Sequence, residues 1–192
     1  MNAVILVGGK SSRMGTNKAF LELKGKTFIE LQIELLREMF DEISISANTP
    51  SEYEYLNLPI FKDIYPGKGP LGGIYTSLIN SSSLHTFMLA CDMPFVGPEL
   101  IKHLKDLTKE YDVVIPKSEN GLEPLHAFYS KNCIEPIKRE LDENNLRIRS
   151  FFPQVNVKIV ELDSLASSDY FKNSIKNLNT MDDYKNVTEN NY

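Results

Sequence analysis

The sequence has few of the residues on which disulfide-bonded or membrane-spanning proteins depend. It contains only two cysteines, Cys91 and Cys133, and they are too widely spaced to suggest a disulfide framework or a zinc site. We therefore expect two reduced, buried thiols in a cytoplasmic protein. No apolar run approaches the roughly 20 residues that a membrane-spanning helix needs. A basic region followed by an apolar segment, the mark of a signal peptide, is also absent from the amino terminus.

Excess positive charge is absent as well. The 192 residues include 21 Lys and Arg against 26 Asp and Glu, which gives a formal net charge of −5, and no run of basic residues occurs. An acidic chain of this kind is a poor candidate for binding the backbone of a nucleic acid. A small phosphorylated ligand needs only local positive charge, so the charge balance does not argue against one.

Two widespread phosphate-binding motifs are missing. Gly25-Lys26-Thr27 ends like a P-loop, but the first glycine of that motif would stand at position 20, which is Phe20. A capping box formed by Thr27 and Glu30 is a sufficient explanation for the threonine. No G-x-G-x-x-G fingerprint follows the first predicted strand, which argues against a dehydrogenase.

The sequence does contain a regular alternation of strand and helix patterns. The predicted strands are 3–6, 42–47, 59–63, 85–90 and 112–116, and the predicted helices begin after Thr27, at Ile74 and at Pro98. Strands and helices thus alternate at least four times in the first 116 residues. This order predicts an α/β fold built from βαβ units, with a mostly parallel sheet covered by helices on both faces.

The second half of the chain is less regular. We predict a strand at 125–129, a helix at 132–141 with Pro136 in its first turn, and a late strand at 157–160. Thr180 and Asp183 can cap a last short helix. His126 in the first of these strands is more typical of a buried histidine with satisfied hydrogen bonds than of a catalyst. Without an internal repeat or a low-complexity linker, we expect a single domain over 1–192.

A glycine-rich loop with two cations follows the first predicted strand. Gly8 and Gly9 give the backbone freedom to turn, and Arg13 and Lys18 add positive charge. A loop of this kind can offer backbone N–H groups and charge to phosphates. The glycines alone would equally suit a tight turn without a ligand, and the cations alone would suit a solvated surface. Their occurrence within ten residues of each other favours phosphate binding.

Two carboxylates follow later strands. Asp92 ends a run of mostly apolar residues, where an unpaired charge is costly. Mg²⁺ favours one or two carboxylates together with phosphate oxygens and water. Asp63 precedes the glycine-dense segment 66–73, and either aspartate could instead cap a helix or a turn. Because ligands of parallel sheets bind beyond the carboxyl ends of the strands, we expect the loop from Gly8, Asp63 and Asp92 to converge.

Together these segments resemble the molybdenum cofactor guanylyltransferases. The family opening, L-A-G-G-x-S-x-R-M-G-x-x-K, is matched from Leu6 to Lys18 with Val7 as the only departure. The further matches are the D-x(n)-G-P-L-x-G segment at 63–73, C-D-x-P at 91–94, P-L-H-A-x-Y at 124–129, S-L-R-x-F-F at 145–152 and N-x-N-T at 177–180. Sugar-1-phosphate nucleotidyltransferases and molybdopterin cytidylyltransferases share the opening, whereas 124–127 and 177–180 are more specific to the guanylyl branch.

The resemblance implies a Rossmann-like three-layer α/β/α fold of the nucleotide-diphospho-sugar-transferase type. It implies a nucleotide-binding half at 1–116 and an acceptor-binding half at 117–192. The residues it assigns to the nucleotide are Leu6, Val7, Gly8, Lys18, Asp63 and Asp92, with Asp92 holding Mg²⁺. The glycine loop adds Gly9 to this set, and the charge that the triphosphate requires assigns catalysis to Arg13, Lys18 and Asp92. We expect the acceptor at Arg147, Arg149, Asn177 and Asn179. Ser46 stands where some family members have an asparagine near the guanine, and Asn48 is a candidate substitute.

The resemblance also implies the reaction. The protein would transfer GMP from GTP to molybdenum-molybdopterin in the cytoplasm, releasing pyrophosphate and using Mg²⁺. Its expected partners are these two substrates, other proteins of cofactor biosynthesis and molybdoenzyme chaperones, with no nucleic acid and no membrane. The alternatives are a cytidylyltransferase, a sugar-1-phosphate nucleotidyltransferase, and a carrier that binds nucleotide or cofactor without turnover. A carrier has no evident need for Asp92, Lys18 and Arg13 together.

Overall fold

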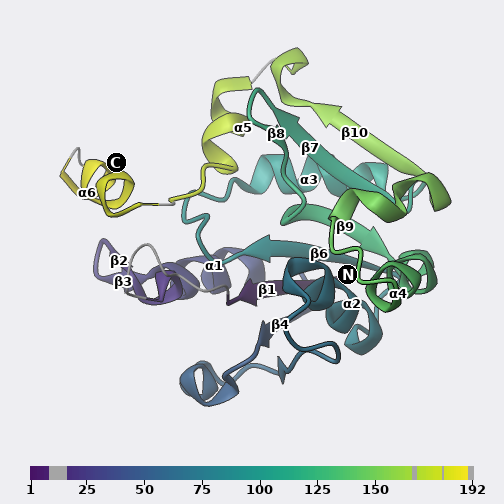
Figure 1. The fold of residues 1–192 in the computed structure, drawn as a ribbon. Coiled ribbons are helices and arrows are strands. Elements are labelled where there is room, and N and C mark those ends of the chain that lie inside the picture. The colour runs from purple at the N-terminus through teal and green to yellow at the C-terminus, as the bar shows by residue number, and fades with distance from the viewer. Residues whose placement is uncertain (9–16, 166–167, 179, 190–192) are drawn as a thin grey trace.

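The chain folds around one mostly parallel sheet (Figure 1). The computed structural model describes residues 1–8, 17–165, 168–178 and 180–189. The strands of the main sheet are β1 (Asn2–Val7), β4 (Glu42–Ala47), β5 (Ile60–Phe61), β6 (His85–Ala90), β7 (Val113–Ser118), β8 (Gly121–Leu122), β9 (His126–Ser130) and β10 (Val157–Glu161). They follow the order β10-β7-β9-β6-β1-β4-β5, with β8 paired to β7. A separate hairpin joins β2 (Glu22–Leu23) and β3 (Lys26–Thr27).

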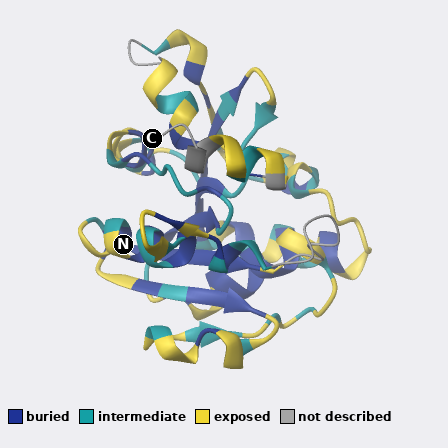
Figure 2. Ribbon diagram, turned by 90° about the vertical axis from the view of Figure 1, so that its left-hand side faces the viewer, coloured by how far each residue is buried: buried dark blue, intermediate teal, exposed yellow. Residues whose placement is uncertain are grey.

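The centre of the sheet is β1, which runs parallel to both β4 and β6. Every residue of β1 and β6 is buried, and Figure 2 shows the buried residues gathered in the sheet. Burial on both faces explains why these strands read as continuous rather than alternating apolar runs. Among the described strands of the main sheet, only β8 and β9 are antiparallel to their neighbours. The chain returns from β7 to β9 through a connection too short for a crossover helix.

Helices cover both faces of the sheet, as predicted. The helices are α1 (Phe28–Arg37), α2 (Gly69–Asn80), α3 (Pro98–Leu107), α4 (Ile134–Asp142), α5 (Ser168–Ser174) and α6 (Met181–Glu189). Short 3₁₀ helices are η1 (Lys18–Phe20), η2 (Pro50–Glu52), η3 (Glu54–Leu56), η4 (Lys131–Cys133), η5 (Ile148–Gln154) and η6 (Leu162–Ser164). One apolar cluster joins α1 and α3 to one face, and a second joins α2, α4 and η5 to the other. The fold is therefore a three-layer α/β/α domain.

The predicted helix caps are present. The Thr27 hydroxyl accepts from the N–H of Glu30, and the Glu30 carboxylate accepts from the N–H of Thr27 at 2.8 Å. Thr180 and Asp183 form the same reciprocal pair at the start of α6. Pro98 begins α3, and Pro136 lies in the first turn of α4. These boundaries follow from local chemistry, which is why the sequence predicts them.

The start of α2 differs from the prediction. The helix begins at Gly69 rather than at Ile74, so the glycine-dense segment forms its first turns. A Cβ atom on Gly73 would lie 2.8 Å from Cδ2 of Leu6 on β1. The glycine therefore serves the close packing of α2 against β1, and does not mark a loop as its residue type suggests.

No helix in the described part of the chain is long and apolar enough to cross a membrane.

Candidate active site

Lys18 and Asp92 meet at the carboxyl ends of the central strands, as predicted. Lys18 lies in η1, which follows β1 in the chain, and Asp92 lies just beyond β6. The ammonium of Lys18 is 2.9 Å from Oδ2 of Asp92, and the two side chains are 16% and 20% exposed. The pair therefore combines limited solvent with an open side, which suits a site that receives a charged ligand.

Lys18 is held in place by its neighbours. Asn17 caps η1 by accepting from the N–H of Ala19 at 3.2 Å. The same side chain donates to the hydroxyl of Tyr53 at 2.7 Å and to Glu52 at 3.0 Å. Tyr53 stacks on Phe20 with ring centroids 5.3 Å apart, and burial raises the pKa of Tyr53 to about 12. Since Tyr53 stays uncharged, this contact orients η1 without adding an anion near Lys18.

The turn that carries Asp92 is fixed from three directions. The N–H of Cys91 donates to the carbonyl of Leu6 on β1 at 3.3 Å, and the N–H of Leu178 donates to the carbonyl of Asp92 at 2.9 Å. From α1, the Gln32 amide donates to the carbonyls of Ala90 and Met93, each at 2.8 Å. The second carboxylate oxygen of Asp92, Oδ1, accepts no hydrogen bond from the described residues.

The glycine loop is only partly described. Leu6 and Val7 are buried at the end of β1, and Gly8 follows with a φ of 127°. Only glycine adopts that conformation without strain, so the turn away from β1 depends on the residue type at this position. Gly9 and Arg13 lie outside the described residues, and their predicted roles remain predictions.

Asp63 lies at the same edge of the sheet, beyond β5. Its carboxylate accepts from the hydroxyl of Ser46 at 3.2 Å and from the amide of Asn48 at 2.9 Å. Ser46 is on β4 and Asn48 follows that strand. Ser46 and Asn48, the position at which the family resemblance suggests a contact with the base and its candidate substitute, thus orient Asp63.

The predicted acceptor residues occupy two separate places. Asn177 donates to Glu123 at 3.5 Å, and it precedes Leu178, which contacts the Asp92 turn. Arg147 and Arg149 are exposed at the start of η5, on the face that α2 and α4 cover. No hydrogen bond or ion pair links either arginine to Asn177 within the described residues. Asn179 lies outside the described residues.

Two residues at the site were missed by the sequence reasoning. Glu123 has a pKa raised by burial, and the nearby Asp92 charge adds to the effect. It directly precedes the Pro124–Tyr129 segment, which was the available signal. Gln32 is a polar residue on the otherwise apolar face of α1 formed by Ile29, Ile33 and Leu36. That interruption was the available signal for Gln32.

The expectation for His126 is half wrong. Its ring is fully buried and meets Phe87 edge to face at 5.1 Å, but neither ring nitrogen has a hydrogen-bond partner among the described residues. Burial lowers the pKa of His126 to about 3, so the ring stays neutral. The ring packs on Phe87 in the core, where no described polar group forms a hydrogen bond with either nitrogen.

The carboxylates suit a cation that arrives with a nucleotide. The described residues hold no group of three His, Cys, Asp or Glu side chains that could bind a metal ion by themselves. Mg²⁺ needs only one or two carboxylates when phosphate oxygens and water complete its octahedron. Oδ1 of Asp92, which accepts no hydrogen bond from the described residues, matches that requirement, and the site therefore fits a divalent cation that the nucleotide brings.

Comparison with known proteins agrees with this geometry. The family model "MobA-like NTP transferase domain" matches residues 3–157. The "Probable molybdenum cofactor guanylyltransferase" of Clostridium perfringens is 38% identical over 190 residues, covering 97% of this chain and 95% of the relative. The "Molybdenum cofactor guanylyltransferase" of Desulfosudis oleivorans is 33% identical over 185 residues, covering 95% of this chain and 92% of the relative.

A solved structure gives the same result. The "Molybdopterin-guanine dinucleotide biosynthesis protein A" of Archaeoglobus fulgidus superposes with a TM-score of 0.83 at 29% identity, over 98% of this chain and 97% of that one. The matched family model spans β1 to the start of β10 and so includes Lys18, Asp63 and Asp92. The chain therefore belongs to the MobA-like NTP transferase family.

Proposed function

We propose that the protein transfers GMP from GTP to molybdenum-molybdopterin, which forms the guanine dinucleotide cofactor and releases pyrophosphate. The names of its full-length relatives support this function. The single observation that carries it is the Lys18–Asp92 pair at 2.9 Å, because it brings a cation and a carboxylate to the end of β1 at which we propose that the phosphates bind.

The reaction forms one bond and breaks one bond. An oxygen of the terminal phosphate of molybdopterin attacks the α-phosphorus of GTP, and the bond from that phosphorus to the β-phosphate oxygen breaks. The attacking oxygen is already an anion, so no strong general base is required. The protein mainly has to align two anions in line and offset their repulsion.

The proposed residue roles follow this requirement. Lys18 and Arg13 offset the charge of the triphosphate, and the backbone of Leu6 to Gly9 holds its oxygens. Asp63, oriented by Ser46 and Asn48, contacts the nucleoside end of GTP. Asn177, beside the Asp92 turn, faces the acceptor. Arg147 and Arg149 bind the acceptor's charged groups from the α2 and α4 side.

Asp92 is the proposed ligand of a divalent cation, for which we favour Mg²⁺. Such a cation, when bound, lowers the electrostatic cost of bringing the two anions together. Burial and the nearby Asp92 charge raise the pKa of Glu123, and Glu123 shares the role of cation ligand only in its ionised form. We place the protein in the cytoplasm, with GTP and molybdenum-molybdopterin as substrates and with cofactor-biosynthesis proteins and molybdoenzyme chaperones as partners.

A transfer assay with labelled nucleotides tests this function. The protein is incubated with molybdopterin, molybdate, Mg²⁺ and each of the four α-labelled nucleoside triphosphates in turn. We expect labelled dinucleotide cofactor and pyrophosphate from GTP, with far less product from the other three. A preference for CTP or for a sugar-1-phosphate acceptor would reject the guanylyl assignment. Nucleotide binding without pyrophosphate release would favour a carrier.

A further inference from the structure

Gln32 is a buried polar residue that contacts the Asp92 turn from α1. It lies on the core-facing side of α1 and is 1% exposed. Its Nε2 donates to the carbonyls of Ala90 and Met93 at 2.8 Å each, and these two carbonyls flank Cys91 and Asp92 in the chain. One side chain of α1 thus spans the turn that presents the Asp92 carboxylate.

The Gln32 amide is oriented so that its NH₂ group, and not its oxygen, faces the turn. Both protons of its NH₂ group serve the two carbonyls, whereas Oε1 is buried and has no hydrogen-bond partner among the described residues. A buried acceptor without a partner costs about 1–3 kcal/mol. An apolar side chain would avoid this cost, so core packing alone does not account for glutamine at position 32.

The helix that carries Gln32 also supports Lys18. η1 contacts α1, and its Ala19 is fully buried in the same apolar cluster as Ile29 and Ile33 of α1. Helix α1 therefore supports both charged groups of the site. It contacts η1, which carries Lys18, and its Gln32 amide binds the turn that carries Asp92. A displacement of the turn relative to α1 would change the distance between them.

We propose that Gln32 is a positioning residue, which holds the Cys91–Met93 turn so that the open oxygen of Asp92 faces the cation bound with the nucleotide. This inference rests on the proposed function for the identity of the nucleotide. Loss of a group that orients a metal ligand typically costs 10- to 100-fold in metal affinity or activity. The affinity for GTP without the cation depends on the loop and should hardly change.

The test uses Mn²⁺ as a spectroscopic probe. Binding of Mn²⁺ to the chain in the presence of GTP is titrated by electron paramagnetic resonance for the wild type, Gln32→Met and Gln32→Asn. Methionine keeps the length and removes both donors, whereas asparagine keeps both donors on a chain one methylene shorter. Thr86→Val is the matched control. It removes a buried hydrogen bond, from Thr86 to Ser81 at 2.8 Å, at the amino end of β6, the strand that the Asp92 turn follows.

We expect Gln32→Met to bind Mn²⁺ about 10- to 100-fold more weakly, Gln32→Asn to lie between it and the wild type, and Thr86→Val to match the wild type. Excess Mg²⁺ should restore part of the turnover of Gln32→Met, and its affinity for GTP without metal should match that of the wild type.

Unchanged Mn²⁺ affinity in folded Gln32→Met would overturn the proposal, and so would an equal loss in Thr86→Val. If neither Gln32 variant folds, the hydrogen bonds serve the core rather than the site, which also overturns it. The readout needs no molybdopterin, so a wild type that shows Gln32-dependent Mn²⁺ binding but transfers no GMP would reject the proposed function alone.

Discussion

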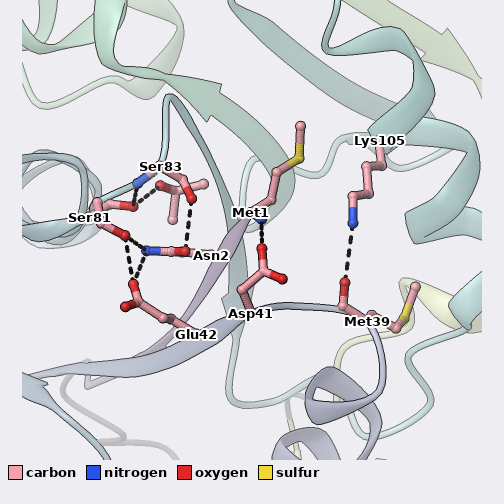
Figure 3. Close-up of polar contacts among 10 residues, drawn as sticks. Met1, Asn2, Met39, Asp41, Glu42, Ser81, Ser83 and Lys105 are labelled. Carbon is pink, nitrogen blue, oxygen red and sulfur yellow. Dashed lines mark hydrogen bonds and ion pairs between the residues drawn. The ribbon is translucent and has the colours of Figure 1, made fainter.

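The two ends of the parallel sheet carry polar groups that are partnered in different ways. At the amino end, the Asn2 amide donates to Glu42 at 2.6 Å and to Ser82 at 3.0 Å, and its oxygen accepts from Ser83 at 2.8 Å (Figure 3). At the carboxyl end, Oδ2 of Asp92 accepts a hydrogen bond from the ammonium of Lys18, whereas Oδ1 has no partner among the described residues.

This difference separates stability from function on the same strands. A closed network satisfies its own polar groups and so stabilises the fold. A partly buried ion pair adds little net stability, because desolvation opposes its attraction, but it can exchange partners with a charged ligand. We therefore expect substitutions at the carboxyl end to reduce activity and substitutions at the amino end to reduce stability.

The largest expected effect is that of Asp92→Asn. The neutral amide binds a divalent cation far more weakly than a carboxylate and removes the negative charge that Lys18 contacts, so turnover should fall about 10³-fold. The free energy of unfolding should change by only about 1 kcal/mol. Glu42→Gln is the matched control, since it makes the same chemical change at the amino end and should retain full turnover per folded molecule. Comparable losses of turnover in both variants would contradict the assignment of function to the carboxyl end and stability to the amino end.

On β9, the buried His126 pairs with Leu89 near the carboxyl end of β6 and should make the fold sensitive to acid. Its folded pKa of about 3 lies below its ordinary value of 6.5, so in that interval the unfolded chain binds a proton that the folded chain does not. Stability is unaffected above about pH 7 and falls as the pH drops, by roughly 2 to 3 kcal/mol at pH 4.5. Urea unfolding from pH 7.5 to 4.5 should show this loss in the wild type but not in His126→Leu. Parallel curves for the two proteins would mean that His126 does not titrate in this range.

Next in size is Asn2→Ala. The truncation removes three hydrogen bonds and leaves Glu42 and two serines of the network without their shared partner, so the free energy of unfolding should fall by about 2 kcal/mol. Urea denaturation measures this change, and turnover per folded molecule should equal that of the wild type. A large loss of turnover at full folding would extend the functional site to the amino end.

The smallest expected effect is that of Lys105→Met at the amino end. Its ammonium donates to the carbonyl of Met39 at 3.2 Å and lies 5.3 Å from the centre of the Phe40 ring (Figure 3 shows the first contact). A partly exposed contact of this kind contributes about 0.5–1 kcal/mol. Thermal unfolding should detect that loss with no change in turnover, and a larger loss would show that α3 depends on this lysine.

The sequence predicts the elements whose boundaries depend on local chemistry. The capping boxes at Thr27 and Thr180, the strands β1 and β6, and the convergence of Lys18 and Asp92 are all confirmed. Each follows from residue type and spacing, together with the rule that ligands bind beyond the carboxyl ends of parallel strands.

Features that depend on tertiary packing were not predictable. The start of α2 at Gly69 reflects the close approach of Gly73 to Leu6, which no local pattern encodes. The unpartnered ring of His126 depends on which core side chains surround it. Gln32 and Glu123 join the site through contacts with distant segments, and the residue pattern alone shows only that Gln32 interrupts an apolar face.

Hydrogen–deuterium exchange with and without GTP and Mg²⁺ tests most directly where the ligand binds. We expect slower exchange in peptides that cover 17–23 and 88–95, at the carboxyl end. Peptides that cover 39–44 and 80–86, at the amino end, should exchange at unchanged rates. Protection confined to the amino-end peptides, or none at 88–95 under saturating GTP, would contradict the placement of the site at Lys18 and Asp92.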